Sequence, residues 1–212
     1  DENGVYLNTL QVFALLALYL LEFKKERGPL IKSLTSSDML FRLGEIYDVP
    51  VMETGVGFKF AGPLMVKENA LIAGEESGGY GFRGHIPERD GILSSLLMLE
   101  FMAETQMKPA GLVQYLQSKV GEWHYRRKDI SFSASKRKEI EKTIDALSGT
   151  KKIGTMQVKS KDNVYGHRLR VERGWVVVRF SGTEPLVRVY AEAETAGIVD
   201  SLMEDVMKRL DI

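Results

Sequence analysis

The sequence predicts an α/β domain followed by a smaller α+β domain. In residues 1–125, short apolar segments alternate with segments of helical pattern, which is typical of a parallel or mixed sheet with helices on both faces. From residue 126 onward, strand-like segments follow one another between two helices, which favours an antiparallel sheet with helices on one face. A chain of 212 residues, with 44% hydrophobic and 27% charged residues, is long enough to form both cores.

The first domain is expected to contain five helices and three strands. We expect helices at residues 10–27, 36–47, 57–69, 90–104 and 109–120, and strands at residues 29–34, 49–53 and 70–74. The first helix is apolar on nearly all sides, so we expect it to be buried between the sheet and other elements. Pro63 is expected to bend the third helix or delay its start, and Pro109 to open the last one.

The second domain is expected to begin after a junction at residues 121–128, which places the domains at 1–125 and 126–212. Its predicted strands cover residues 129–133, 155–159, 164–171, 175–180 and 186–192. A charged amphipathic helix is expected at residues 136–147 and a closing helix at 196–210. Consecutive strands of this kind indicate antiparallel pairing.

Composition argues against several classes of protein. The 29 Lys and Arg balance the 29 Asp and Glu, so no basic excess favours nucleic acid as a partner. The most apolar segment, residues 12–21, is shorter than the roughly 20 residues that span a bilayer. The acidic start lacks the basic region of a signal peptide, and the absence of cysteine suits a cytoplasmic protein. We therefore expect cytoplasmic localisation, with neither nucleic acid nor membrane as a partner.

A glycine-rich loop, Gly74-Glu75-Glu76-Ser77-Gly78-Gly79, directly follows a predicted buried strand. Ligands bind at the carboxyl ends of strands in open parallel sheets. In an extended loop Glu75 and Ser77 would project the same way and suit neighbouring sugar hydroxyls. A polar turn joining strand to helix is the alternative, and the spacing alone does not choose between the two. A serine-hydrolase elbow is excluded, because it needs glycine two residues before the serine.

A second loop joins two predicted strands and carries phosphate-binding residue types. It contains Arg179, Ser181, Gly182 and Thr183, and Arg188 follows on the next strand. Two hydroxyls, an open backbone and two arginines suit a phosphate dianion, because arginine donates bidentate hydrogen bonds and turn amides bind anions. The alternative is a hairpin turn with solvated arginines.

Two further motifs carry polar groups near predicted helix starts. Gly57 and Lys59 follow the second strand, but their spacing is not that of a dinucleotide-binding fingerprint. Lys59 would reach an anionic group or a hydroxyl there, or else be solvated. His85 precedes the helix at 90–104, where it would shuttle protons near neutral pH or serve as a structural hydrogen-bonding residue, with Glu88 or Asp90 capping the helix.

In this order the four motifs resemble the α-D-phosphohexomutases, the family of phosphoglucomutases and phosphomannomutases. The motifs are Gly57-Phe58-Lys59, the loop 74–79, His85 to Gly91, and Arg179 to Pro185. The resemblance covers essentially the whole chain and matches the last two of the family's four domains. It implies that Gly57, Lys59, Glu75 and Ser77 bind the sugar. It also implies that the phosphate that is not reacting is bound by Arg179, Ser181, Gly182, Thr183 and Arg188.

The resemblance further implies an isomerase of carbohydrate metabolism that transfers a phosphoryl group. Such enzymes interconvert hexose 1-phosphate and hexose 6-phosphate, here of glucose or mannose, through a bisphosphorylated intermediate. They are phosphoproteins with a phosphoserine, and we expect the full-length protein to need Mg²⁺ and glucose 1,6-bisphosphate. The opening Asp1-Glu2-Asn3-Gly4 is similar to the stretch just beyond the family's metal-binding loop.

The phosphoserine motif and the metal-binding loop are not found in these 212 residues. We therefore expect no catalytic or metal-binding residue and no bound cofactor in this chain, and no mutase activity from it alone. Its expected partners are the phosphosugar and the missing N-terminal domains. The alternative is a phosphosugar-binding or regulatory module that never catalyses.

Two positions depart from glucose-specific members of the family. Val56 stands where several of them have threonine, and Arg89 stands where they have a lysine proposed to transfer protons. Arginine stays protonated to above pH 12, so we expect Arg89 to stabilise charge. His85 and Arg89 are thus the candidates for proton transfer or charge stabilisation.

Overall fold

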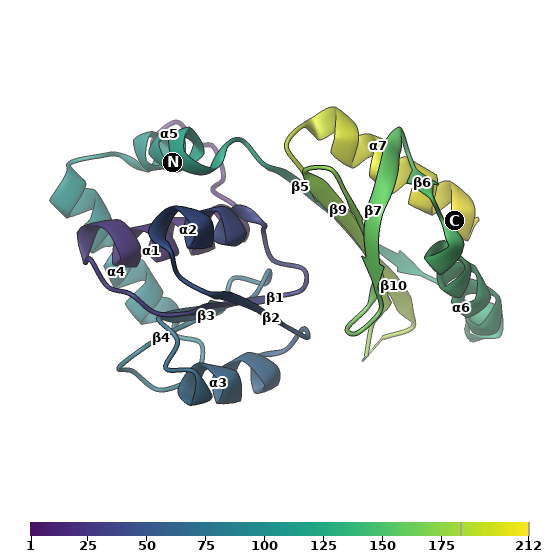
Figure 1. Ribbon diagram of the computed structural model, residues 1–212, viewed down its shortest axis with the longest axis horizontal. Helices are drawn as coiled ribbons and strands as arrows, with labels where there is room; N and C mark the ends of the chain where they lie inside the picture. Colours follow the sequence, from purple (N-terminus) through teal and green to yellow (C-terminus); the bar gives the residue numbers. More distant parts are fainter. Residues whose placement is uncertain (183, 212) are drawn as a thin grey trace. The chain divides into compact units, whose positions relative to one another are not determined.

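The computed structural model of the protein describes residues 1–182 and 184–211 (Figure 1). The chain divides into two compact units, Asp1–Gly121 and Glu122–Ile212. Over the described part of the chain, no helix combines the length and apolar character needed to cross a membrane.

The first unit has a four-stranded mixed sheet in the order β2-β1-β3-β4. Its strands are β1 (Leu30–Ser33), β2 (Val51–Thr54), β3 (Ile72–Gly74) and β4 (Tyr80–Phe82). β1 pairs in parallel with both β2 and β3, whereas β4 runs antiparallel to β3. The parallel strands therefore end at one edge of the sheet.

Helices lie on both faces of this sheet, as the sequence predicts. They are α1 (Thr9–Leu18), which continues into a π-helical turn, η1 (Tyr19–Phe23), then α2 (Met39–Tyr47), α3 (Phe58–Lys67), α4 (Gly91–Thr105) and α5 (Pro109–Val120). Figure 1 shows α1 and α2 on one side of the sheet and α3 on the other. The α/β prediction for this part of the chain is confirmed.

Three local expectations for the first unit were wrong. The strand β4 was not predicted, because a three-residue strand centred on Gly81 carries no readable periodicity. The first helix ends at Phe23, not at residue 27, and Lys25 adopts a left-handed backbone conformation with φ 56°. Of the two effects expected of Pro63, a late start of the helix is wrong, because α3 begins at Phe58 and contains the proline in its interior, while the expected bend stays a prediction.

Packing on both faces fixes the end of β3, which carries the glycine-rich loop. On one face the Phe13 ring lies so close to Gly74 that a Cβ there would come within 2.6 Å of it. Phe13 also stacks on Tyr80 of β4 at 5.3 Å between ring centroids. On the other face Ala73 belongs to a buried cluster that includes Phe58 of α3. The loop after β3 is thus supported by a close-packed interior.

The second unit has a six-stranded sheet in the order β5-β10-β9-β8-β7-β6, with antiparallel neighbours throughout. The strands are β5 (His124–Ser131), β6 (Lys152–Ile153), β7 (Met156–Asp162), β8 (His167–Val171), β9 (Gly174–Phe180) and β10 (Leu186–Ala193). The helices are α6 (Arg137–Ala146) and α7 (Ala196–Leu210), with short 3₁₀ turns η2 (Ala134–Lys136) and η3 (Leu147–Gly149).

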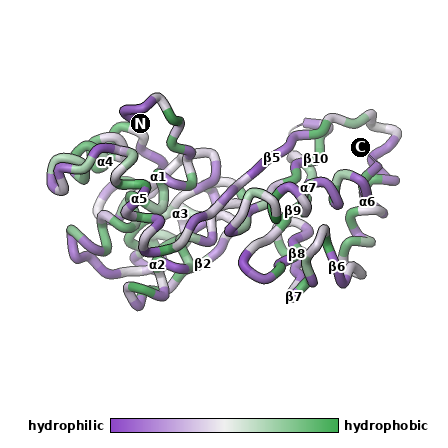
Figure 2. Tube along the Cα trace, turned by 90° about the horizontal axis from the view of Figure 1, so that it is seen from above, coloured by the Kyte–Doolittle hydropathy of each residue, from purple (hydrophilic) through white to green (hydrophobic). Residues whose placement is uncertain are grey.

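One hydrophobic cluster joins α6 and α7 to the sheet of the second unit. It includes Ile144 of α6, Val206 of α7 and Val189 of β10. The α+β prediction is confirmed. β5 begins five residues earlier than the strand expected at 129, because this edge strand is largely exposed and hydrophilic along most of its length (Figure 2), so it lacks an alternating apolar pattern.

Candidate functional site

The glycine-rich loop is a closed turn between β3 and β4. The Glu75 backbone N–H donates to the Gly79 carbonyl at 3.0 Å, and the Gly78 N–H donates to the Glu75 carbonyl at 3.1 Å. The expectation of an extended loop was therefore wrong, because these bonds fold residues 75–79 back on themselves. Glu75 is only 5% exposed, whereas Ser77 is exposed.

The Glu75 carboxylate links three segments of the first unit. Its Oε1 accepts a hydrogen bond from the Gly57 backbone N–H at 2.7 Å, and its Oε2 lies 3.8 Å from Nη1 of Arg89. Gly57 immediately precedes α3 and has φ 122°, a conformation that side-chain-bearing residues rarely adopt. The structure thus brings together Gly57, Glu75 and Arg89, which come from three separate motifs of the sequence.

Arg89 lies across the turn that carries Glu75. A Cβ at Gly79 would come within 2.2 Å of Cδ of Arg89, so the arginine occupies the space that a side chain at 79 would need. Its guanidinium carbon is 5.8 Å from the Phe58 ring centroid, and Nε is 3.0 Å from the Glu88 carboxylate. Ring and carboxylate therefore orient the guanidinium beside Glu75.

An open cleft of about 620 Å³ borders these residues. It is lined by Gly57, Phe58, Lys59, Gly62, Pro63, Val66, Pro87, Glu88 and Arg89. Lys59 is exposed, and its ammonium is 5.0 Å from the Phe60 ring centroid. The cleft therefore has two cations on its wall, Lys59 and Arg89, which suits an anionic or hydroxyl-rich ligand.

His85 is tied to the start of α4. Its Nε2 is 2.8 Å from Oδ2 of Asp90, whose Oδ1 accepts the Leu93 backbone N–H at 2.8 Å and so caps the helix. The hydrogen bond from the Leu93 N–H holds the pKa of Asp90 below its usual value, and the hydrogen bond with the His85 ring lowers it further. His85 thus combines an exposed ring with a fixed hydrogen-bond partner.

The turn 75–79 is anchored to the first turn of α1. The Thr9 hydroxyl donates to the Glu76 carbonyl at 2.6 Å, and the Tyr80 hydroxyl donates to the Thr9 carbonyl at 2.5 Å. Gly78 has φ 92°, and a Cβ there would approach the Thr9 methyl to 2.7 Å. The glycine allows α1 and the turn to approach closely.

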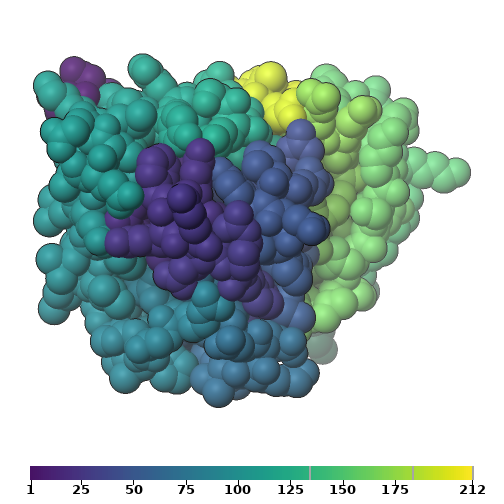
Figure 3. Space-filling view, turned by 60° about the vertical axis from the view of Figure 1, so that its left-hand side comes forward, coloured from purple at the N-terminus to yellow at the C-terminus, as the bar shows by residue number. Residues whose placement is uncertain are grey.

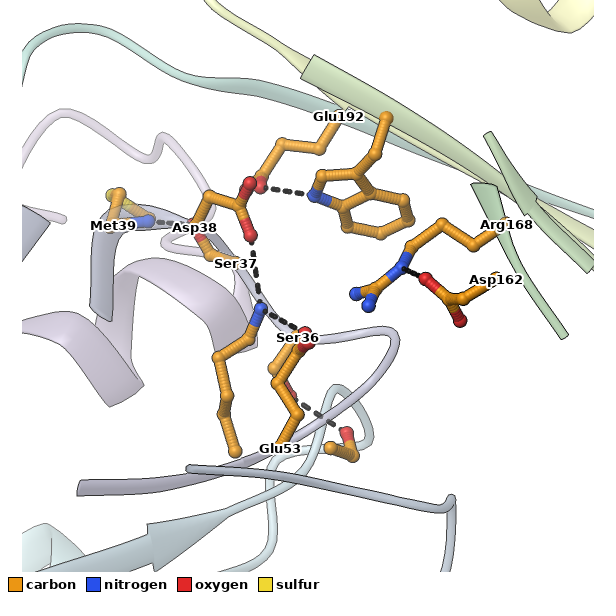
Figure 4. Close-up of polar contacts among 11 residues, drawn as sticks. Ser36, Ser37, Asp38, Met39, Glu53, Asp162, Arg168 and Glu192 are labelled. Carbon is orange, nitrogen blue, oxygen red and sulfur yellow. Dashed lines mark hydrogen bonds and ion pairs between the residues drawn. The ribbon is translucent and has the colours of Figure 1, made fainter. Parts of the chain in front are cut away.

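The sequence analysis missed Lys32, which lies at the carboxyl end of β1. It is in register with Glu53 of β2 and Gly74 of β3, and it is fully buried. Its ammonium donates to Asp38 at 3.1 Å and to Glu53 at 3.2 Å (Figure 4). A lysine inside a four-residue buried strand was the available signal, because such a charge needs partners.

The second unit holds the other group of predicted residues. Arg179 of β9 and Arg188 of β10 are directly opposite each other in the antiparallel ladder. Arg179 donates from Nη2 to the buried Tyr190 hydroxyl at 3.1 Å, and its guanidinium carbon is 5.6 Å from that ring's centroid. The tyrosine thereby fixes the position of the guanidinium.

Arg188 lies between two carboxylates. Its Nε is 3.3 Å from Asp129 of β5, and its Nη2 donates to Glu184 at 3.2 Å. Asp129 also receives two hydrogen bonds from Arg127, at 2.7 and 2.8 Å. These hydrogen bonds from Arg127 are the main cause that holds the pKa of Asp129 below its usual value. The nearby charges of Arg188 and Arg179 lower the pKa further. With Glu184 included, the three guanidinium groups of Arg127, Arg179 and Arg188 lie near two carboxylates, so the local charge is still positive.

The loop between β9 and β10 starts with Ser181, whose N–H donates to the Leu186 carbonyl at 2.8 Å. Ser181 is buried, and Gly182 is exposed with nothing near the position of a Cβ. Thr183, the third expected residue of this loop, lies outside the described residues. Two further polar pairs of the second unit appear in Figure 4. Arg168 of β8 donates to Asp162 of β7 at 2.7 Å. The Trp175 indole N–H of β9 donates to Glu192 of β10 at 3.1 Å, at the end of these two strands away from the loop that joins them.

Comparison with known families assigns both units. Residues 8–120 match the family model described as phosphoglucomutase/phosphomannomutase, alpha/beta/alpha domain III, and residues 135–209 match the C-terminal domain of the same family. The chain belongs to the phosphoglucomutase/phosphomannomutase family. The resemblance seen in the four sequence motifs is confirmed.

Individual relatives agree with this family assignment. A phosphoglucomutase/phosphomannomutase of Thermococcus kodakarensis is 29% identical over 92% of this chain and 40% of its own length. A phosphoglucosamine mutase of Lawsonia intracellularis is 27% identical over 97% of this chain and 42% of its own length. A solved phosphomannomutase-type structure from Thermus thermophilus is 34% identical with a TM-score of 0.80, covering 99% of this chain and 42% of that one. The chain thus spans about two fifths of the length of these relatives.

Proposed function

We propose that the full-length protein interconverts hexose 1-phosphate and hexose 6-phosphate, with glucose and then mannose as the sugars to test first. In this proposal, the chain supplies the sugar-binding and phosphate-binding half of the enzyme. Family membership supports the mutase reaction in general terms. The preferred sugar is open to experiment, because the relatives include phosphoglucosamine mutases.

The observation that carries the proposal is the cross-strand pair of Arg179 and Arg188. A mutase that moves phosphate between two ends of one sugar must accept the sugar in two reversed poses. A fixed anchor for the phosphate that is not reacting meets this requirement, because it is used in both poses. Two oriented arginines beside a turn are suited to that task, since each offers a planar fork of donors to phosphate oxygens. Ser181, Gly182 and Thr183 belong to the same proposed anchor.

The cleft of the first unit is proposed to hold the sugar. Lys59 on the cleft wall and Ser77 on the turn after β3 are exposed and would donate to hydroxyls, while Gly57 lines the cleft and donates its N–H to Glu75. Glu75 is nearly buried and already accepts the Gly57 N–H, so we assign it both a positioning role and, through its remaining lone pairs, a contact with a hydroxyl. Arg89 is proposed to stabilise charge, and His85 remains a candidate for proton transfer.

Magnesium and glucose 1,6-bisphosphate are proposed as cofactors of the full-length protein. Among the residues that the structure describes, no group of three or more His, Asp or Glu side chains is arranged to hold a metal ion. The described residues therefore do not fit the metal, and no step of the proposal passes through it here.

A mutase assay on the full-length protein tests the proposed function. Glucose 1-phosphate, mannose 1-phosphate and glucosamine 1-phosphate are supplied separately, with Mg²⁺ and a trace of the matching 1,6-bisphosphate, and the 6-phosphates are measured. Turnover of at least one hexose phosphate, reduced at least tenfold in an Arg179→Ala variant, supports the proposal. No turnover of any of the three by well-folded protein overturns it and favours the non-catalytic alternative.

A further inference from the structure

Two buried N–H groups of the second unit have no hydrogen-bond acceptor. They are the Nε groups of Arg179 on β9 and Arg188 on β10, and no described residue accepts a hydrogen bond from either nitrogen. Asp129 lies close to one of them, with 3.3 Å between its Oδ2 and Nε of Arg188, but this contact is an ion pair without the geometry of a hydrogen bond. Buried donors are normally paired, so these two N–H groups are suited to a ligand oxygen.

Arg127 occupies the carboxylate that Arg188 would otherwise bind. It lies two residues before Asp129 on β5, so both side chains are on one face of the sheet. Nε of Arg127 donates to Oδ1 of Asp129 at 2.7 Å, and Nη2 donates to Oδ2 at 2.8 Å. This bidentate pair engages both carboxylate oxygens, which is the strongest arrangement that arginine and a carboxylate form. The longer contact left to Arg188 is its consequence.

A second contact fixes Arg127 in the same part of the sheet. Arg127 is opposite Tyr190 in the ladder of β5 and β10, and its guanidinium carbon is 5.6 Å from the tyrosine ring centroid. The guanidinium carbon of Arg179 lies at the same distance from this ring. β5 forms one edge of the sheet, whereas the light-green region of β7 and β8, toward the other edge, forms part of the surface in Figure 3. Arg127 thus approaches the arginine pair from the β5 edge.

Asp129 is a potential competitor of phosphate for Arg188. Carboxylate and phosphate oxygens accept the same hydrogen bonds from a guanidinium, and Asp129 is held permanently at the site. Its lowered pKa keeps it ionised at neutral pH. Glu184, the other carboxylate near Arg188, is a weaker competitor, because its side chain is 57% exposed and water screens the pair. An Asp129 with unoccupied oxygens would therefore turn to Arg188.

We propose that Arg127 is a positioning residue of the phosphate anchor, which keeps Asp129 from capturing Arg188. By holding both oxygens of Asp129, it leaves Nε of Arg188 available to a phosphate oxygen. Arg127 acts through Asp129 and does not itself contact the phosphate. The inference rests on the proposed phosphate anchor, and it adds a residue that lies outside the four sequence motifs.

A double-mutant cycle in the full-length protein tests this role. Arg127→Met is made in the wild type and in an Asp129→Asn background, and binding of glucose 1-phosphate is measured by titration calorimetry. EDTA is present to remove the Mg²⁺ that the proposed reaction needs. In the wild-type background we expect Kd to rise about fivefold or more, because Asp129 then pairs with Arg188. In the Asp129→Asn background the same change should alter Kd by about twofold or less, because a neutral amide binds a guanidinium more weakly.

Lys128→Met is the matched control. It removes one positive charge from the neighbouring position of β5, where the exposed side chain points to the opposite face of the sheet. It should change Kd by about twofold or less in both backgrounds, since only screened, long-range attraction is lost. Urea unfolding shows that each variant is folded. Where Arg127→Met folds poorly, Arg127→Gln replaces it, with the same expected difference between the backgrounds.

Unchanged affinity in the Arg127 variant overturns the proposal. An equal loss in both backgrounds also overturns it, because Arg127 would then contact the phosphate directly or act only through the fold. Failure of the wild type to bind glucose 1-phosphate contradicts the phosphate anchor itself, and the role of Arg127 with it. The wild-type titration therefore distinguishes failure of the proposed function from failure of the role assigned to Arg127.

Discussion

Arg179 and Arg188 form a directly opposed cross-strand pair on β9 and β10, so two guanidinium groups share one position of the ladder. Like charges placed opposite each other destabilise a sheet. Asp129, opposite Arg188 on β5, offsets part of this repulsion. Glu184, which also pairs with Arg188, offsets a further part. The positive potential that remains would favour an anion, and this is the physical basis of the proposed phosphate anchor.

Arg179→Ala is expected to weaken phosphosugar binding by about 1.5–3 kcal/mol, or roughly ten- to a hundredfold in Kd. The reason is the loss of charge-assisted hydrogen bonds from a guanidinium that Tyr190 holds in place. Arg179→Lys should recover only part of the affinity, because a point charge lacks the bidentate fork. Titration calorimetry with glucose and mannose phosphates should give the same loss for both, since the proposed anchor would contact the phosphate and not the sugar.

Arg126→Ala is the matched control for this experiment. Arg126 is an exposed arginine of β5 that pairs with Asp200 of α7, away from the β9–β10 turn. Its removal should leave affinity within about twofold. Unchanged affinity in Arg179→Ala, or an equal loss in both variants, would contradict the proposed phosphate-binding role of Arg179.

Two substitutions of Glu75 should separate its positioning role from its charge. Glu75→Ala leaves the Gly57 N–H without its acceptor, at a cost of about 1–3 kcal/mol of stability, and should lower turnover of the full-length enzyme about a hundredfold. Glu75→Gln retains an acceptor for Gly57 but removes the negative charge beside Arg89. We expect it to restore stability while turnover stays low.

Steady-state kinetics and urea unfolding of the same preparations provide both measurements. Glu45→Ala, an exposed carboxylate of α2 that pairs with Arg42, is the control and should change neither quantity. Wild-type turnover in Glu75→Ala would show that the loop is a structural turn with no role in the reaction.

The sequence was sufficient to predict the long helices and strands of the fold. β4 and the first part of β5 were missed because each depends on pairing with another part of the chain. α5 and α7 have the predicted bounds, because proline at the start of one and amphipathic spacing in the other are local signals. β4 pairs with β3 through only three residues, so its existence depends on a turn that brings them together. β5 is stabilised by pairing with β10, which follows more than fifty residues later in the chain. Its charged first part, residues 124–128, therefore gave no local sign of a strand, and only its end was predicted.

The candidate site was predictable in its residue types but not in its contacts. Glu75 and Arg179 were found because polar groups occur where apolar strands end, and Arg89 was found through the family resemblance. The bond from Gly57 to Glu75 joins a backbone amide to a side chain eighteen residues away, and no sequence pattern encodes it. Lys32 was missed because it continues an apolar strand, where only the fold reveals the two carboxylates that neutralise it.

Gly57→Ala should lower turnover more than its effect on stability would suggest. At φ 122° a side chain strains the backbone, by about 1–3 kcal/mol, while no atom outside the neighbouring residues 59 and 60 obstructs the new Cβ. The strain should displace the N–H that Glu75 accepts and so alter the cleft. Gly84→Ala is matched to it, because Gly84 has φ 81° and open space around it.

Both glycine variants should lose comparable stability in urea unfolding, but only Gly57→Ala should lose activity, by about tenfold or more. Equal activity in the two variants would show that the geometry at Gly57 does not matter for the reaction.

Asp129→Asn should reveal a pH-dependent contribution to stability. The pKa of Asp129 is lowered in the folded protein, chiefly by hydrogen bonds from Arg127, relative to about 3.9 in an unfolded chain. A lowered pKa means that the folded state favours the ionised form, so this stabilisation is complete above about pH 4. It is lost as the pH falls through the folded-state value. The free energy of unfolding of the wild type should therefore exceed that of Asp129→Asn by a constant amount at pH 5–7, and the difference should shrink below about pH 4.

The size of the difference is expected to be about 1 kcal/mol or less at neutral pH, because the carboxylate is partly exposed and water screens the pair. Urea unfolding at a series of pH values from 7 to 3 measures it. Glu172→Gln, which neutralises an exposed carboxylate in the turn between β8 and β9, gives the baseline for removing one negative charge. A difference between wild type and Asp129→Asn that grows as the pH falls would have the wrong sign. That outcome would show that Asp129 is not stabilised in its ionised form by the arginines around it.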